Sequence, residues 1–140
     1  MKKIAVVFWS GTGNTEEMAK AVVSGAQAAG ASVTKYTAAD FSDSLVDGFD
    51  AIAFGCPAMG SESLEDSEFE PMFDSVKAKL SGKSIGLFGS YGWGDGEWMR
   101  NWEDDCKAAG AVLAADPVIC NDAPDDDAVA ACKALGAALA

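Results

Sequence analysis

The sequence predicts an α/β protein in which helices cover both faces of a parallel sheet. Short apolar runs alternate with stretches of helical periodicity, each run is continuously apolar, and the 140 residues suffice for one core. Five strand–helix units at this length give a three-layer α/β/α, doubly wound, five-stranded parallel sheet. The predicted strands are Ile4–Trp9, Ser32–Tyr36, Ala51–Gly55, Ile85–Gly89 and Val112–Ile119.

Helical periodicity fills most of the gaps between these strands. The first helix is expected to begin near Gly13-Asn14-Thr15 and to stop at Gly30. Three aspartates occupy the first turn of the last helix, where the helix dipole favours them. No repeat or low-complexity linker interrupts the pattern, so one domain is expected over residues 1–140. The other predicted helices are Glu68–Leu80, Glu97–Ala109 and Asp125–Leu139.

Charge and composition exclude several classes of function. The net charge is -12, from 10 basic and 22 acidic residues, which disfavours nucleic acid and anionic membranes as partners. There is no histidine, and the four cysteines form no C-x-x-C pair, so neither a metal site nor a redox dithiol is indicated. The first apolar run is too short to cross a bilayer and lacks the features of a signal peptide. We therefore expect a soluble cytoplasmic protein with reduced cysteines.

The loop after the first strand has the composition of a phosphate site. Its glycines let backbone N–H groups share one concavity at a helix start, and its hydroxyls and amide are uncharged donors. Glu16 stands where a dinucleotide fingerprint needs glycine, and no lysine occurs before Lys20, which excludes a nucleotide-triphosphatase loop. An ordinary glycine-rich turn is the alternative. The candidate residues are Ser10, Gly11, Thr12, Gly13, Asn14 and Thr15.

The loop after the third strand could line a flat ligand. Met59 offers a soft apolar surface, Gly60 allows either sign of φ, and Glu62 is an acceptor without a cationic neighbour in sequence. A tight surface turn is the alternative. The candidates are Pro57, Ala58, Met59, Gly60, Ser61 and Glu62.

The loop after the fourth strand presents aromatic side chains between glycines. Because glycines flank Trp93, no neighbouring bulk buries its ring, and the ring can face a planar ligand. The alternative is that Trp93 caps the edge of the core and Tyr91 has no role in binding. The candidates are Ser90, Tyr91, Gly92, Trp93 and Gly94.

Two further candidates rest on weaker signals. Asn121 follows the last strand, where an ordinary turn is an equal alternative. Trp9 lies at the end of the first strand and is a candidate for contact with the bound ligand. For Trp9, Trp98 and Trp102, however, packing is the favoured interpretation.

The loop Ser-Gly-Thr-Gly-Asn-Thr at residues 10–15 resembles the FMN phosphate loop of flavodoxins, whose pattern is Thr/Ser-x-Thr-Gly-x-Thr. The resemblance extends over the whole chain and favours the short-chain branch, because no insertion of about twenty residues interrupts the fifth strand. It implies strand order 2-1-3-4-5 and non-covalently bound FMN. It also implies a low-potential one-electron carrier that cycles between semiquinone and hydroquinone and turns over no substrate of its own.

The same resemblance implies roles for individual residues. The loop at residues 10–15 would bind the FMN phosphate without a positive side chain. The Gly60–Ser61 peptide would flip on reduction and accept a hydrogen bond from flavin N(5)–H, and Glu62 would accept from N(3)–H. Trp93 would stack on the outer face of the flavin. No metal site is implied.

Acidic residues gather after the third, fourth and fifth strands, at the edge of the sheet that carries these loops. Basic-surfaced redox proteins, such as flavodoxin or ferredoxin reductases and ferredoxin-dependent enzymes, are therefore the expected partners of a monomer. The same charge should oppose formation of an anionic reduced flavin. The acids are Glu62, Glu65, Asp66, Glu68, Glu70, Asp95, Glu97, Asp122, Asp125, Asp126 and Asp127.

Two other functions are alternatives for a chain with this predicted fold. A small FMN-dependent quinone or nitro reductase would need room over the flavin, which Trp93 would obstruct. A response-regulator receiver needs an acidic pair at the end of the first strand, and Trp9-Ser10 stands there instead.

Overall fold

The computed structural model describes residues 2–59, 63–92 and 94–140. Its central sheet has the order β2-β1-β3-β4-β5, and every strand pair is parallel. The strands are β1 (Lys3–Phe8), β2 (Ser32–Thr37), β3 (Ala51–Gly55) and β4 (Ser84–Tyr91), followed by the two parts of the fifth position. The predicted fold class and strand order are confirmed.

The fifth position of the sheet is divided. β5 (Val112–Leu113) pairs with the start of β4, and β6 (Val118–Asn121) pairs with its end. The prediction of one continuous strand over Val112–Ile119 is wrong. Pro117 lies in the interruption and has no N–H to donate to a strand ladder. As a result, the carboxyl end of β6 lies beside Tyr91 of β4.

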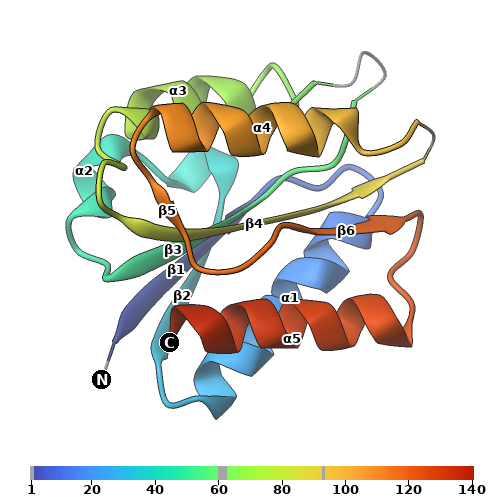
Figure 1. The fold of residues 1–140 in the computed structure, drawn as a ribbon, viewed down its shortest axis with the longest axis horizontal. Helices are drawn as coiled ribbons and strands as arrows, with labels where there is room; N and C mark the ends of the chain where they lie inside the picture. The colour runs from blue at the N-terminus through green and yellow to red at the C-terminus, as the bar shows by residue number, and fades with distance from the viewer. Residues whose placement is uncertain (1, 60–62, 93) are drawn as a thin grey trace.

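Two pairs of helices cover the sheet, one pair on each face (Figure 1). One face carries α1 (Asn14–Ala28) and α5 (Asp126–Leu139), and the other carries α3 (Phe69–Lys77) and α4 (Glu97–Ala108). The helix α3 ends at Lys77 and not at the predicted Leu80. The short elements η1 (Ala38–Asp40) and α2 (Asp43–Val46) link β2 to β3, and both are too short to show periodicity in the sequence.

The two faces pack with different side chains. Under α3 and α4, aromatic rings interlock, with the Phe54 and Phe73 centroids 5.2 Å apart and those of Phe69 and Trp102 5.4 Å apart. Between α1 and α5 the residues are small. A Cβ added to Gly136 would lie 2.1 Å from the Val22 carbonyl oxygen, so only glycine permits this close crossing. In both layers the helices begin at the sheet edge where the parallel strands end, which places their N-termini around one site.

In the part of the chain that the structure describes, none of the helices is long and apolar enough to span a membrane.

Candidate functional site

The loop between β1 and α1 is closed by one hydroxyl group. Ser10 Oγ accepts hydrogen bonds from the backbone N–H groups of Gly13 at 3.1 Å and of Glu16 at 3.3 Å. Gly13 has φ 97°, in the left-handed region that glycine enters without a steric cost. The loop is thus shaped before any ligand arrives, and the Ser10 hydroxyl keeps its proton to donate.

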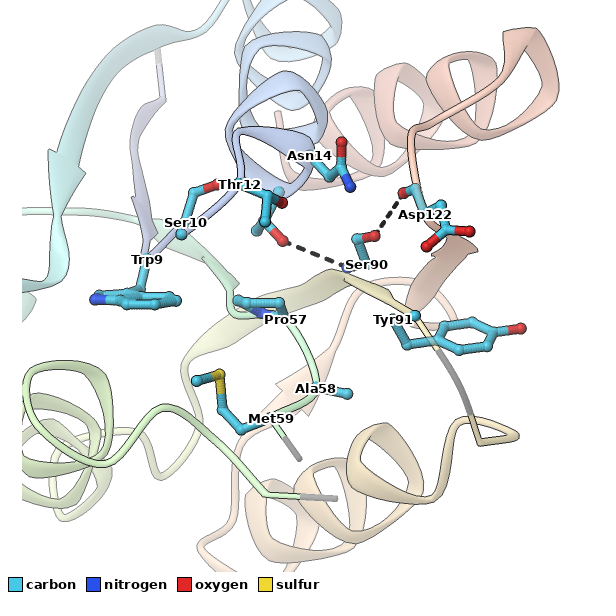
Figure 2. A pocket seen from close by; sticks show the side chains of 13 residues that line it. Trp9, Ser10, Thr12, Asn14, Pro57, Ala58, Met59, Ser90, Tyr91 and Asp122 are labelled. Atoms are coloured by element: carbon cyan, nitrogen blue, oxygen red, sulfur yellow. Dashed lines mark hydrogen bonds between the residues drawn. The ribbon is translucent and has the colours of Figure 1, made fainter. Parts of the chain in front are cut away.

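This loop forms one wall of a cavity of about 260 Å³ beyond the carboxyl ends of the strands. Figure 2 shows Ser10, Thr12 and Asn14 on one side of it, with Pro57, Ala58 and Met59 facing them. The cavity is lined by Trp9, Ser10, Gly11, Thr12, Asn14, Thr15, Pro57, Ala58, Met59, Ser90, Tyr91, Gly92 and Asp122.

Most of the predicted site residues that are described line this cavity, and three do not. Gly13 forms the turn behind it, and Gly94 and Asn121 are absent from the lining. The Asn121 side-chain amide donates to the Tyr91 carbonyl at 3.3 Å. The predicted candidates Gly60, Ser61, Glu62 and Trp93 lie outside the described residues.

Asp122 lines the cavity and was not among the predicted site residues. Its φ is 57°, a left-handed conformation that aspartate tolerates better than most residues. In the sequence, Asp122 lies in the polar turn Asn121-Asp122-Ala123-Pro124 after the last strand. The composition of this turn does not indicate which of Asn121 and Asp122 lines the cavity.

The loop after β3 is held at its beginning by contacts from distant elements. The indole N–H of Trp98 donates to the Cys56 carbonyl at 3.1 Å, and the Ala58 N–H donates to the Ser90 carbonyl at 3.0 Å. The Glu65 N–H donates to Cys56 Sγ at 3.4 Å. Burial raises the pKa of the Cys56 thiol to about 12, so this sulfur stays protonated and serves as a packing group.

Glu65 anchors the other end of the same loop. Its carboxylate accepts from the backbone N–H groups of Ser67 at 2.8 Å, Glu68 at 2.7 Å and Phe69 at 2.9 Å, and from the Ser67 hydroxyl. Burial alone would raise the pKa of Glu65, but these hydrogen bonds outweigh it and lower the pKa to about 2. Glu65 is 4 % exposed and caps the start of α3, which corrects its assignment to the surface acids.

Trp9 serves both packing and the cavity. Its ring forms one side of the cavity in Figure 2, and its Nε1–H donates to Glu68 Oε1 at 3.1 Å. Trp98 and Trp102 are buried on α4, as the sequence predicted.

The lining divides into two chemical halves. One half offers uncharged donors at the start of α1, from the hydroxyls of Ser10, Thr12 and Thr15 and the Asn14 amide. The other half is apolar, with Trp9, Pro57, Ala58, Met59 and Tyr91. A phosphate fits the first half, because a helix N-terminus binds anions without a cationic side chain. A planar ring fits the second half, so the residues present fit FMN.

Comparisons with known proteins agree with this fit. The flavodoxin family model matches residues 6–135. The chain is 47% identical over 137 residues to the flavodoxin of Megasphaera elsdenii, covering 98% of each, and 44% identical over 121 residues to that of Clostridium beijerinckii, covering 86% of this chain and 88% of the relative. The structure of two-electron reduced Megasphaera elsdenii flavodoxin matches with a TM-score of 0.90, covering 97% of each chain. The chain belongs to the flavodoxin family.

Membership of the flavodoxin family establishes the general function. The chain binds FMN and is a low-potential electron carrier, with no substrate turnover of its own. The alternative of a quinone or nitro reductase is therefore not supported.

The acidic edge expected of this flavodoxin is smaller than the sequence suggested. Glu65 is buried, and Asp95 forms an ion pair with Arg100 at 3.0 Å. The other described members of the set are exposed and follow β3, β4 and β6. They are Asp66, Glu68, Glu70, Glu97, Asp122, Asp125, Asp126 and Asp127.

Proposed function

We propose that the cavity holds FMN with its phosphate against the loop at residues 10–15 and its ring against Met59 and Tyr91. The observation that carries this proposal is the divided lining, with uncharged donors at a helix start and apolar side chains opposite them. Thr12 and Asn14 would donate to the phosphate oxygens together with the first N–H groups of α1.

FMN supplies the one-electron chemistry when bound. The chain's own residues give the site its shape and exclude water from it. Ser10 holds the phosphate loop closed, and Thr15 Oγ1 accepts from the Ser90 N–H at 3.4 Å, which ties that loop to β4. Trp9, Met59 and Tyr91 shield the apolar half from water. The roles proposed for Gly60, Ser61, Glu62 and Trp93 stay predictions.

Binding and redox titrations test this proposal. FMN fluorescence should be quenched in a saturable 1:1 titration of the FMN-free chain. An anaerobic reductive titration of the loaded chain should then show two separated one-electron steps. A single two-electron step, or fluorescence that does not respond to the chain, would contradict the assignment of this cavity.

We also propose that the exposed acids around the cavity guide a basic redox partner toward it. Asp66, Glu68 and the aspartates at the start of α5 are exposed on the same edge. Opposite charges accelerate encounter, and salt screens that attraction over about 8 Å at physiological ionic strength. The association rate with a ferredoxin-type reductase should therefore fall as salt rises. A rate independent of salt would sink this steering proposal.

The free cysteines support a monomer in a reducing compartment, which we propose to be the cytoplasm. Sedimentation at micromolar concentration should give the mass of one chain with or without a reductant. A dimer that the reductant dissociates would contradict this, and cell fractionation tests the compartment.

A further inference from the structure

Ser90 lies near the end of β4 and connects three segments that surround the cavity. Its backbone N–H donates to Thr15 Oγ1 at 3.4 Å, and its carbonyl accepts from the Ala58 N–H at 3.0 Å. Its hydroxyl donates to the Asp122 carbonyl at 2.5 Å, as Figure 2 shows. Ser90 is 4 % exposed. The side chain makes the bond to Asp122 and also interacts with the Cys120 thiol on β6, so a substitution can remove these interactions while the two backbone bonds stay.

Asp122, the acceptor of this bond, has an uncommon backbone conformation. Its φ of 57° makes it the one non-glycine residue with positive φ in the described ranges. Such a conformation persists when surrounding contacts hold it, and it often marks a functional position. Here the holding contacts are the Ser90 hydroxyl, the Cys120 thiol, which donates more weakly to the same Asp122 carbonyl at 3.6 Å, and the Tyr91 carbonyl, which accepts from the Asp122 N–H at 2.8 Å.

Asp122 also carries the charge of the cavity wall. Among the described lining residues it is the one with a carboxylate or a basic side chain. It stands next to the segment Ser90–Gly92, where a Cβ added to Gly92 would lie 3.7 Å from Asp122 Oδ1. A carboxylate fixed at this place would oppose the arrival of an electron in the cavity, because like charges repel at short range even where one of them is exposed to solvent.

We propose that the Ser90 hydroxyl is a positioning group that holds Asp122 in its left-handed conformation and thereby sets the effect of the Asp122 carboxylate on electron uptake. The proposal rests on the proposed binding of FMN in this cavity. Ser90 acts through Asp122, and its hydroxyl touches the Asp122 backbone.

The first test uses the FMN-free chain and Ser90→Ala. Hydrogen exchange at the Asp122 amide should become about tenfold faster, because the turn that protects this amide loses its shortest hydrogen bond to the Asp122 carbonyl. Exchange at the Ala58 amide should stay unchanged, since its acceptor is the Ser90 backbone. Ser75→Ala is the matched control. It removes a hydroxyl that donates to the Met72 carbonyl at 2.9 Å on α3, and Ser75 does not line the cavity.

The second test uses the FMN-loaded chain and a double-mutant cycle that combines Ser90→Ala with Asp122→Asn. Asparagine tolerates the left-handed conformation but carries no charge. Asp122→Asn should raise the potential of the second one-electron step, and Ser90→Ala should raise it by a smaller amount. In the Asp122→Asn background, Ser90→Ala should add nothing to that potential. FMN affinity should fall about fivefold in Ser90→Ala.

The outcomes separate this inference from the proposed function. If the unmodified chain fails to bind FMN in two one-electron steps, the proposed function fails. Suppose instead that the unmodified chain binds FMN and shows two one-electron steps. The positioning role is then overturned if Ser90→Ala and Ser75→Ala have the same exchange rate at the Asp122 amide and the same potential of the second step. It is also overturned if Ser90→Ala shifts that potential equally with and without the Asp122 carboxylate. Should Ser90→Ala not fold, Ser90→Cys keeps a weak donor and should give smaller changes in the same direction. Values equal to those of the unmodified chain would then overturn the role.

Discussion

The two loops that face each other across the cavity are held in different ways. The loop after β1 is fixed within itself, by the Ser10 hydroxyl and the left-handed Gly13. The loop after β3 is fixed from outside at its beginning, by Trp98 on α4 at Cys56, and its far end is fixed to the start of α3 by the buried carboxylate of Glu65. A loop of the first kind should respond to substitution mainly in ligand affinity, and a loop of the second kind in the stability of the whole fold.

Removing the Glu65 carboxylate should have the largest effect. Glu65→Ala leaves the buried N–H of Phe69 and the partly buried N–H of Glu68 without their acceptor, and it uncaps α3. We expect the free energy of unfolding to fall by about 3 kcal/mol, measured by urea denaturation. Glu70→Ala is the control, because Glu70 is exposed in the first turn of the same helix, and its effect should stay within about 0.5 kcal/mol. If Glu65→Ala and Glu70→Ala lowered the free energy of unfolding equally, the loop after β3 would not be tied to the stability of the fold through Glu65.

The contribution of Glu65 should also depend on pH. Its pKa is about 2 in the folded chain against an ordinary value of 4.5, so folding favours the ionised form. The stabilisation is complete above the unfolded pKa and is lost as pH falls from about 4.5 toward 2. The difference in unfolding free energy between the unmodified chain and Glu65→Gln should therefore shrink over that range. A difference that stays constant from pH 6 to about pH 2.5 would argue against an ionised Glu65 in the fold.

Removing the indole donor of Trp98 should have the next largest effect. Trp98→Phe leaves the Cys56 carbonyl without its bond to Trp98. The control is Trp102→Phe, because Trp102 Nε1 is buried without a hydrogen-bond partner among the described residues. Both variants lose similar packing, so Trp98→Phe should be about 2 kcal/mol less stable than Trp102→Phe in thermal or urea unfolding. If Trp102→Phe were the less stable variant, the bond to Cys56 would not be what anchors the loop.

The Ser10 hydroxyl should matter for affinity more than for stability. Ser10→Ala frees the N–H groups of Gly13 and Glu16 and loosens the loop. FMN should bind about tenfold more weakly in a fluorescence titration, while the free energy of unfolding should change by less than about 1 kcal/mol. Ser42→Ala, which removes an exposed hydroxyl paired with Ser44, serves as the control. A loss of stability as large as that of Glu65→Ala would show that this loop, too, is part of the global fold.

The bond between Trp9 and Glu68 should have the smallest effect. Trp9→Phe keeps an aromatic ring at the cavity and removes the 3.1 Å bond to an exposed carboxylate. Stability should change by less than about 0.5 kcal/mol and FMN affinity by less than about threefold. A larger loss of affinity with unchanged stability would mean that the indole itself contacts the ligand.

The comparison also explains which parts of the site the sequence revealed. Ser10, Thr12, Asn14 and Thr15 stand within six residues, so the spacing of donors shows the phosphate cradle directly. For Glu65 and Asp122, the sequence predicts only membership of an acidic surface. Whether a carboxylate is buried and capping, or exposed at a cavity wall, depends on chain segments that sequence spacing does not bring together.

The sequence by itself determined the alternation of strands and helices, the parallel sheet and the uncharged phosphate loop, because these follow from local periodicity and short-range hydrogen bonding. Tertiary structure decided the break of the last strand into β5 and β6, where Pro117 and the end of β4 act together. It also decided the burial of Glu65, whose N–H meets Cys56 Sγ at the end of β3, and the left-handed turn at Asp122, which depends on Ser90 and Tyr91 of β4.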